Sequence, residues 1–395
     1  MKKIIFFISS PLYKKDLIRY GYKILKKNNF EVSFYNFGPI LFPKMFKNAK
    51  QELRYQGKNQ KIFFSLHKAL LEISKIDTNC FIFCTVHYNF KSHSIFRAMS
   101  KSKLSYGLST INLVPNKYKK KVTFEAIYKK IFNFQFSLLH LKLLGRVFKY
   151  KNAKLLGIKS PDAIIAGGAN SINSNKFDLA DNHTKVLWTH TYDYDTYLKN
   201  INSKKLSFNK IAVFIDAPSP MFPHDSLIPG ISSPLTVKKY YPSLCKFFDL
   251  VEKSLRLKVI IAAHPKSQHT RFPKYFGGRE VVYNKTSELI KISNLVINRN
   301  STSINFAILY NKPLIFHTTD EIEGSIGMSD QIKSMSSTLG KKPINIDKVN
   351  IIDWDKLMKI DRKLYSKYKN LYIKKSKTSN RMIWQSLSDW LKNNF

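Results

Sequence analysis

The chain has 395 residues, and its 67 lysines and arginines outnumber its 26 aspartates and glutamates to give a formal net charge of +41. That length exceeds one ordinary domain and predicts two. Hydrophobic residues make up 44% of the chain and aromatic residues 14%. This apolar content is enough to build real cores, and it excludes intrinsic disorder over most of the length.

Cysteine use and hydropathy exclude further classes. Cys80, Cys84 and Cys245 are an odd, sparse set, which argues against a disulfide-stapled secreted protein and for a reducing cytosol. No cysteine and histidine cluster has zinc-site spacing. No apolar run approaches the ~20 residues of a membrane-spanning helix. The apolar run from Ile4 to Ile8 is too short for a signal peptide and predicts a buried strand instead.

The first half of the chain alternates short apolar runs with amphipathic stretches. The expected strands are Lys3–Ser9, Phe30–Phe37, Cys80–His87, Pro161–Ala166 and Lys185–Thr189. The expected helices are Tyr13–Lys27 and Ser92–Lys101. This alternation indicates βα units around a parallel sheet. The first half therefore looks Rossmann-like, although it has no GxGxxG loop.

A polar stretch, Asn200–Asn209, is typical of a linker, and a second α/β unit follows it. The expected strands there are Ile211–Ile215, Lys258–Ala263, Glu280–Tyr283, Leu295–Asn298 and Pro313–His317. The expected helices are Pro242–Ser254, Ser287–Ser293 and Ser303–Tyr310. From Asp353 the chain reads as helices, with Trp384 and Trp390 on apolar faces. The short connections match those of α/β units.

These elements predict an α/β protein with two Rossmann-like domains that face a central cleft, followed by C-terminal helices. We place the first domain at residues 1–200, a linker at 201–209 and the second domain at 210–350. A helical tail at 351–395 could cross back to the first domain.

The positive charge is concentrated in one segment. Between Lys101 and Ser160 there are fourteen lysines and arginines and one acidic residue, Glu125. A compositional bias towards lysine could account for part of the total charge. The uneven block still predicts a surface that faces an anionic partner: membrane lipid, nucleic acid or a charged glycan. Within it, residues 124–148 predict either a core helix or a helix seated in a membrane interface.

Two motifs in the second half could bind phosphate. His264 and Pro265 follow a buried strand, at the carboxyl end where open α/β sheets bind ligands. A histidine there can donate to a phosphate oxygen, and the proline stiffens the turn. The second motif, NRNSTS at 298–303, lies between a strand and a helix. Its hydroxyl and N–H groups can bind an anion, although Ser301 or Thr302 could simply cap the helix.

Together with the strand Lys312-Pro313-Leu314-Ile315-Phe316, these motifs resemble the nucleotide-binding domain of GT-B glycosyltransferases. The likeness is to bacterial sialyl-, nonulosonate- and Kdo-transferases that use CMP-activated sugars, and more distantly to teichoic-acid polymerases that use CDP-alcohols. It covers about residues 210–320. It implies a GT-B fold, an acceptor-binding N-terminal domain, and a nucleotide-sugar-binding second domain. The residues it implies for the donor phosphate are His264, Ser301, Thr302 and Ser303. We add their neighbours Pro265 and Asn300 to the predicted phosphate-binding set.

Inverting transfer needs a group that takes the proton of the acceptor hydroxyl. Asp216 ends the first strand of the second half, and Asp225 follows nine residues later. Both are candidates for this base, beside His264 as the catalytic contact to the leaving phosphate. Asp216 could equally be a turn or cap carboxylate. The acidic D/E-D/E-G triplet of the sialyltransferase families does not occur in the sequence.

Weaker patterns are expected to line the acceptor side. Gly167 and Gly168 follow a strand and could admit a ligand close to the backbone, or form a plain turn. Asp193 and Asp195 form a DxD pattern, which in GT-A glycosyltransferases binds a metal ion. Here we expect an exposed helix start with His190 beside it, and no metal.

The sequence thus predicts a cytoplasmic glycosyltransferase, peripheral on the inner membrane, that builds capsule, O-antigen or lipooligosaccharide. It would transfer a sugar, CMP-activated and nonulosonic or Kdo-like, to a glycan or lipid-linked glycan acceptor with inversion. No cofactor is expected, because histidine and a helix dipole can offset the charge of the leaving nucleotide.

Two alternatives keep the enzyme and change the donor: a UDP-sugar, or phosphotransfer from a CDP-alcohol. The alternative outside enzymes is a nucleic-acid-binding protein, which the charge and the aromatic residues support. The sequence contains no helix-turn-helix, RNP or zinc-finger pattern, so no nucleic-acid partner is expected.

Overall fold

The computed structural model describes residues 3–48, 54–116, 147–203, 206–220, 233–264, 267, 273–325, 327–348 and 352–394. Some sequence predictions fall outside these residues: Asp225, Pro265, and residues 117–146 of the basic segment with most of the 124–148 helix. They stay predictions.

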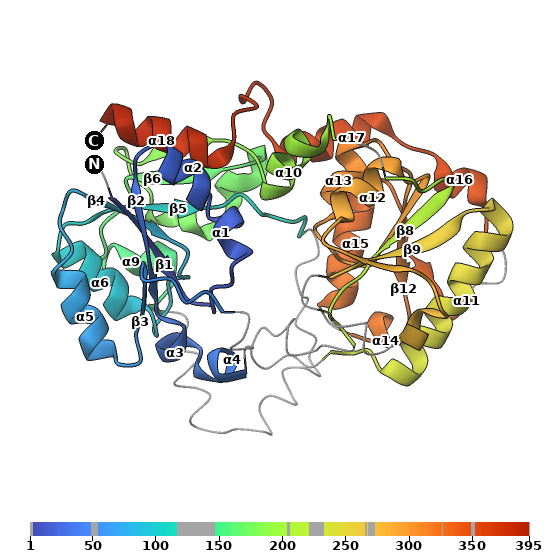
Figure 1. Ribbon diagram of the computed structural model, residues 1–395, viewed down its shortest axis with the longest axis horizontal. Coiled ribbons are helices and arrows are strands. Elements are labelled where there is room, and N and C mark those ends of the chain that lie inside the picture. Colours follow the sequence, from blue (N-terminus) through green and yellow to red (C-terminus); the bar gives the residue numbers. More distant parts are fainter. Residues whose placement is uncertain are drawn as a thin grey trace. The chain divides into compact units, whose positions relative to one another are not determined.

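The chain forms two compact α/β units (Figure 1). The first contains the described residues up to Leu113, those from Val147 to Tyr192, and those from Lys375 onward. The second contains residues 114–116 and the described residues from Asp193 to Lys374. Apart from the short stretch at 114–116, the chain leaves the first unit after Tyr192 and returns to it at Lys375.

The first unit is built on a seven-stranded sheet, with all neighbouring strands parallel, in the order β3-β2-β1-β4-β5-β6-β7. The strands are β1 (Lys3–Ile8), β2 (Glu31–Asn36), β3 (Gln60–Ile62), β4 (Cys80–Cys84), β5 (Ser105–Ser109), β6 (Ala163–Ala166) and β7 (Lys185–Trp188). The order reverses between β1 and β4, as in a Rossmann fold, and such a switch point is where open α/β sheets bind ligands.

Strand β1 shows why helices cover both faces of this sheet. Successive residues of a strand point to opposite faces, and here Ile5 and Phe7 join one core while Ile4, Phe6 and Ile8 join another. All five side chains are at most 1% exposed. A strand that is apolar on both faces is typical of a parallel sheet between two helical layers.

The helices of the first unit divide between these two cores. On one face α5 packs against α6, and on the other α18 lies alongside α2 (Figure 1). The α-helices are α1 (Asp16–Arg19), α2 (Tyr22–Lys27), α3 (Gly38–Leu41), α4 (Pro43–Asn48), α5 (Leu66–Ser74), α6 (His93–Lys101), α9 (Tyr150–Ala153) and α18 (Ile383–Asn394). Two 3-10 helices, η1 (Ala169–Asn173) and η2 (Asn175–Leu179), follow β6.

Helix α18, the last helix of the chain, completes the core of the first unit. The Trp384 side chain is 1% exposed. Its ring lies with centroids 5.3 Å from Phe6 and 5.0 Å from Phe83, both edge-on. Its indole N–H donates to the Arg19 carbonyl oxygen over 2.7 Å. This helix therefore contacts the central strands directly.

The single helix predicted over Tyr13–Lys27 was wrong, because the chain breaks it into α1 and α2 at Gly21. Gly21 has φ of +61°, and a Cβ there would lie 2.1 Å from Cγ of Trp384. Only glycine adopts this backbone freely and lets it pass so close to the indole. A contact with a residue more than 350 positions away thus interrupts the helix.

The second unit is built on a six-stranded parallel sheet in the order β10-β9-β8-β11-β12-β13. The strands are β8 (Ile211–Ile215), β9 (Lys258–Ala263), β10 (Val281–Tyr283), β11 (Leu295–Asn298), β12 (Leu314–Thr318) and β13 (Ile344–Asn345). The order again reverses around the first strand, between β8 and β11. Two parallel Rossmann-like sheets with C-terminal helices confirm the predicted fold class.

The helices of the second unit pack around one large core that includes Phe214 and Phe248. They are α10 (Tyr192–Asn200), α11 (Val237–Leu255), η5 (Pro273–Phe276), α12 (Thr286–Ile292), α13 (Ile304–Leu309), α14 (Asp320–Glu323), α15 (Met328–Thr338), α16 (Trp354–Met358), α17 (Arg362–Tyr368) and η6 (Lys369–Ile373). The helix expected from Pro242 begins five residues earlier, at Val237.

Candidate functional site

The carboxyl edge of the second sheet collects most of the predicted donor-site residues. β8 lies between β9 and β11, and all three are parallel. The residues that follow these strands, Asp216, His264 and Arg299, therefore emerge at one edge of the sheet. This edge includes the switch point between β8 and β11.

Asp216 and His264 are joined directly. The Asp216 carboxylate accepts a hydrogen bond from the backbone N–H of His264, with 3.1 Å between Oδ2 and N. The Asp216 carboxylate is almost fully buried, at 5% exposure for the residue. On the other side of the histidine, its carbonyl oxygen accepts from the N–H of Ser267 over 2.9 Å. Asp216 thus holds the start of the loop after β9, and with it the position of His264.

The segment after β11 turns tightly before α13 begins at Ile304. The Asn298 side-chain oxygen accepts from the N–H of Ser301 over 3.1 Å. The Ser301 hydroxyl in turn accepts from the N–H of Ser303 over 3.2 Å, and the carbonyl oxygen of Thr302 accepts from Asn305. The Asn300 side chain donates to Gln331 over 3.1 Å. The Ser301 hydroxyl is therefore held in position by the backbone of the turn.

The amide nitrogen of Asn298 has no hydrogen-bond partner among the described residues, although the side chain is fully buried. A buried amide donor without a partner is costly in a folded protein. Asn298 ends β11 at the edge that carries Asp216 and His264, so this donor marks a polar position next to the candidate site.

Sequence reasoning missed Arg299, which is only 2% exposed. Both terminal guanidinium nitrogens donate to the Ser219 carbonyl oxygen over 3.1 Å. The guanidinium also lies 5.3 Å from the ring centre of Tyr240. Arg299 is thus a buried positive charge directly before the turn at 300–303, and its Nε also donates to the Asn300 side-chain oxygen over 3.2 Å. The available signal was an arginine directly after the fully buried strand β11.

His317, in β12, has a structural role. Its Nδ1 lies 3.1 Å from the Asn298 carbonyl oxygen and its Nε2 lies 3.1 Å from the Tyr240 hydroxyl. A carbonyl only accepts, so Nδ1 carries the proton and Nε2 accepts from the tyrosine. Burial, together with the charge of Arg299, lowers the pKa of His317 to about 3, and burial raises the pKa of Tyr240 to about 12. Both groups are therefore neutral at pH 7.

Acidification is expected to destabilise the protein through His317. The pKa of His317 is about 3 in the folded state against 6.5 for a free histidine, so the unfolded state binds one more proton between these values. The contribution of His317 to stability is complete above pH 6.5 and is lost as the pH falls, by at most about 1.4 kcal/mol per pH unit. Denaturant titrations between pH 7 and pH 4 measure this slope. In the His317→Gln variant the slope of stability against pH should be smaller by the contribution of one proton, at most about 1.4 kcal/mol per pH unit. An unchanged slope would contradict the assignment.

The predicted acceptor-side residues of the first unit lie against the returning chain. The Gly167 N–H donates to the Ser171 hydroxyl over 3.0 Å, and its carbonyl oxygen accepts from the N–H of Lys375. Gly168 precedes η1 with an ordinary extended backbone. His190 is fully buried, with Nε2 3.0 Å from the Arg381 carbonyl oxygen. Gly167 and His190 thus both contact the segment that leads into α18.

The DxD residues lie in the first turn of α10 in the second unit. Asp193 accepts a hydrogen bond from the Asn305 amide over 2.8 Å, and Asp195 is only 7% exposed. Asn305 belongs to α13, so Asp193 anchors the helix that follows the candidate phosphate turn. In the segments that the structure describes, no three His, Cys, Asp or Glu side chains gather to form a metal site. Within those same segments, no helix has the length and hydropathy needed to cross a membrane.

The fold places the chain among known structures. No protein-family model and no curated protein matches the sequence. UDP-GlcNAc 2-epimerase from Methanocaldococcus jannaschii matches over 100% of both chains, with a TM-score of 0.50 and 11% identity. S. aureus MnaA in complex with UDP matches over 100% of this chain and 95% of its own, with a TM-score of 0.50 and 14% identity.

A variant of the wall teichoic acid polymerase TagF matches over 100% of this chain and 89% of its own, with a TM-score of 0.50 and 13% identity. At such identities the likeness shows the fold alone. It confirms the GT-B-like fold that the sequence resemblance implied, and the nucleotide of the donor stays a prediction.

Proposed function

We propose that this protein is a glycosyltransferase that takes a sugar from a nucleotide-activated donor, with the donor phosphates bound at the carboxyl edge of the second sheet. The observation that carries the proposal is the hydrogen bond between the His264 N–H and the Asp216 carboxylate. These two residues follow the neighbouring strands β9 and β8, and the serine and threonine turn at 301–303 follows β11, the next strand of the sheet. The first unit is the proposed acceptor-binding domain.

Each residue of this edge has a proposed role. His264 donates to the leaving phosphate, and the Ser301, Thr302 and Ser303 turn binds its oxygens. The buried Arg299 stabilises the negative charge that develops there as the glycosidic bond breaks. Asp216 is the proposed positioning residue for His264, and Asp225 is the remaining candidate for the base that accepts the proton of the acceptor hydroxyl.

The proposed donor is a CMP-activated nonulosonic or Kdo-like sugar, used to build a surface polysaccharide. The HP and serine/threonine motifs support a cytidine nucleotide. Of the structures that share the fold, one is the TagF variant soaked with CDPG and another is MnaA with UDP. A UDP-sugar donor and phosphotransfer from a CDP-alcohol are therefore the outcomes to test against it.

Cytidine nucleotides are expected to raise the melting temperature of the protein. A ligand that binds only the folded state stabilises it by about 2.7 kcal/mol at a concentration one hundred times its Kd. Thermal-shift measurements with CMP, CDP, UDP and GDP compare the four, and Ser301→Ala should reduce the shift by CMP. Tighter binding of UDP or GDP would overturn the cytidine assignment, and no shift with any of them would overturn the donor site.

The shared fold also requires a control for a different reaction. UDP-GlcNAc 2-epimerases have this fold, so each bound nucleotide sugar should be incubated without acceptor. Formation of a glycosylated product with an added glycan acceptor would support the proposed glycosyltransferase activity. Conversion of the donor to its 2-epimer in the absence of acceptor would replace the proposed function.

We further propose that the protein works at the anionic cytoplasmic face of the membrane, where lipid-linked acceptors lie. The fourteen basic residues between Lys101 and Ser160 support this. Changing Lys119, Lys120 and Lys121 to glutamate should weaken sedimentation with vesicles containing anionic lipid, most strongly at low salt. Wild-type protein that ignores such vesicles, or prefers duplex DNA at physiological salt, would contradict the proposal.

A further inference from the structure

A pocket of about 410 Å³ opens at the carboxyl edge of the first sheet, a size typical of small-ligand sites. Its walls follow β4 and β5, the two strands beyond the switch point of this sheet. All of its described lining residues belong to the first unit. The lining residues are Arg19, Phe83, Cys84, Thr85, His87, Ser109, Thr110, Ile111, Asn112, Leu113, Ser174, Asn175, Lys176 and Tyr192.

The charge of this lining is one-sided. Arg19 and Lys176 are cationic, and no aspartate or glutamate is among the described lining residues. The lining residue Cys84 does not supply a negative charge to balance these two cations. Burial raises the pKa of its thiol to about 12, so the thiol stays neutral. The rest of the polar lining consists of hydroxyl, amide and imidazole groups that can bond to sugar hydroxyls.

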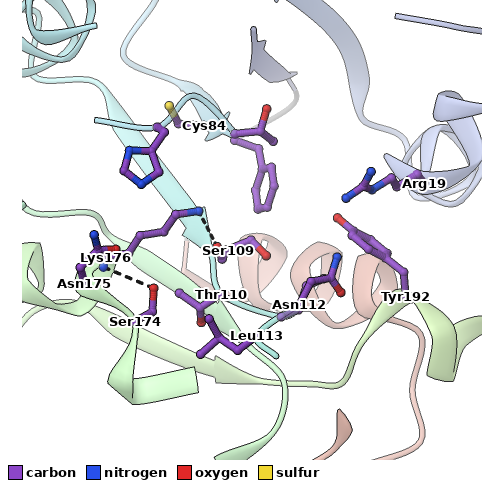
Figure 2. Close-up of a pocket in the computed structure, with 14 residues that line it drawn as sticks. Arg19, Cys84, Ser109, Thr110, Asn112, Leu113, Ser174, Asn175, Lys176 and Tyr192 are labelled. Carbon is purple, nitrogen blue, oxygen red and sulfur yellow. Dashed lines mark hydrogen bonds between the residues drawn. The ribbon is translucent and has the colours of Figure 1, made fainter. Parts of the chain in front are cut away.

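Lys176 is held in place over the pocket. Its ammonium donates to the Ser109 carbonyl oxygen over 2.7 Å, as Figure 2 shows. An ammonium has three donors, so two remain for other partners. Burial lowers the pKa of Lys176, and no carboxylate of the described residues contributes to the shift. A partly buried cation without a counter-charge is costly, and a bound anion would supply the missing charge.

Arg19 lies on the opposite side of the pocket from Lys176, beside Tyr192 (Figure 2). Its guanidinium is 5.1 Å from the centre of the tyrosine ring. The Arg19 backbone is fixed independently, because its carbonyl oxygen accepts the indole N–H of Trp384. The two cations therefore flank the opening from α1 and η2, which are far apart in the sequence.

We propose that this pocket binds a sugar that carries a carboxylate or phosphate group, with Lys176 and Arg19 contacting the anion and the surrounding hydroxyl and amide side chains contacting the ring. The proposal rests on the proposed function in naming this sugar as part of the acceptor. It assigns a charged acceptor to the enzyme, whereas the candidate site in the second unit concerns only the donor.

The test measures sugar binding to the full-length protein by calorimetry without any nucleotide. Glucuronic acid and glucose 6-phosphate are expected to bind at least about tenfold more tightly than glucose, since charge-assisted hydrogen bonds are the stronger ones. A preference between the two anions identifies the group on the acceptor. Equal binding of charged and neutral sugars would overturn the proposal.

The variants are Lys176→Gln and Arg19→Gln, with Lys154→Gln as the matched control. Lys154 also donates to a backbone carbonyl, that of Ala180, over 2.8 Å, but it is exposed and does not line the pocket. Lys176→Gln should weaken binding of the charged sugar about tenfold or more while Lys154→Gln binds as the wild type does. Unchanged binding in a folded Lys176→Gln protein would overturn the proposal.

A nucleotide titration separates this proposal from the proposed donor site. Lys176→Gln should leave CMP binding unchanged, and Ser301→Ala should leave charged-sugar binding unchanged. Loss of nucleotide binding in Lys176→Gln would assign the pocket to the nucleotide and overturn the proposal. If the protein binds the charged sugar but none of the nucleotides, the result would refute the proposed donor site and leave this proposal standing.

Discussion

Replacing His264 with alanine is expected to lower the turnover of glycosyl transfer by about a hundred- to a thousandfold, which corresponds to about 2.7–4 kcal/mol for one preorganised donor to a developing charge. The melting temperature should stay near that of the wild type. The hydrogen bond from residue 264 to Asp216 comes from the backbone N–H, and alanine keeps it. Steady-state kinetics and a thermal melt on the same preparation measure both effects.

Two further variants give this prediction its controls. His183→Ala removes an exposed histidine of the first unit and should leave both turnover and melting temperature unchanged. Asp216→Asn keeps an oxygen that can accept the His264 N–H, so a small effect would support positioning and a loss as large as that of His264→Ala would assign the carboxylate a chemical role. Near-wild-type transfer by folded His264→Ala protein would refute the proposed role of the histidine.

Trp384→Ala is expected to destabilise the protein by about 3–5 kcal/mol, the usual cost of removing a buried aromatic side chain. The substitution removes edge-on contacts with Phe6 and Phe83 and leaves the Arg19 carbonyl oxygen without its indole donor. For a unit of about 200 residues this predicts a melting temperature lower by roughly 6–20 °C. Differential scanning calorimetry measures it.

Trp390 is the matched control for this prediction. It is in the same helix, is only partly buried, and contacts Phe81 at a longer centroid distance of 5.8 Å. Trp390→Ala should therefore cost clearly less stability than Trp384→Ala. Equal losses for the two variants would contradict the larger contribution assigned to the buried Trp384 contacts.

The parts of the fold that could be predicted were those with an unambiguous local pattern. Apart from the lysines that begin β1 and β9, the strands β1, β4, β8 and β9 are continuous apolar runs, as is typical of strands buried on both faces. β5 has the sequence SYGLS, which reads like a turn. Its glycine is required because a Cβ at Gly107 would lie 2.8 Å from the ring of Phe81. That requirement comes from a neighbouring strand and is not visible locally.

The candidate site divides in the same way. His264 and the serines at 301 and 303 follow buried strands, so their place at a sheet edge could be predicted from the strand pattern alone. The contact of Asp216 with the His264 backbone could not, because it depends on which strands are neighbours. Arg19 and Lys176 come from segments more than 150 residues apart, and only the assembled first sheet brings them to one pocket.

The return of α18 to the first unit has a consequence for the order in which the protein is made. About 200 residues separate the departure at Tyr192 from the return at Lys375 and beyond, and a ribosome adds roughly 5–20 residues per second. The first unit therefore waits roughly 10–40 seconds for the helix that covers its central strands. During that interval the groove for Trp384 beside Phe6 and Phe83 is open, so the nascent first unit is the stage at which chaperone binding or aggregation would act.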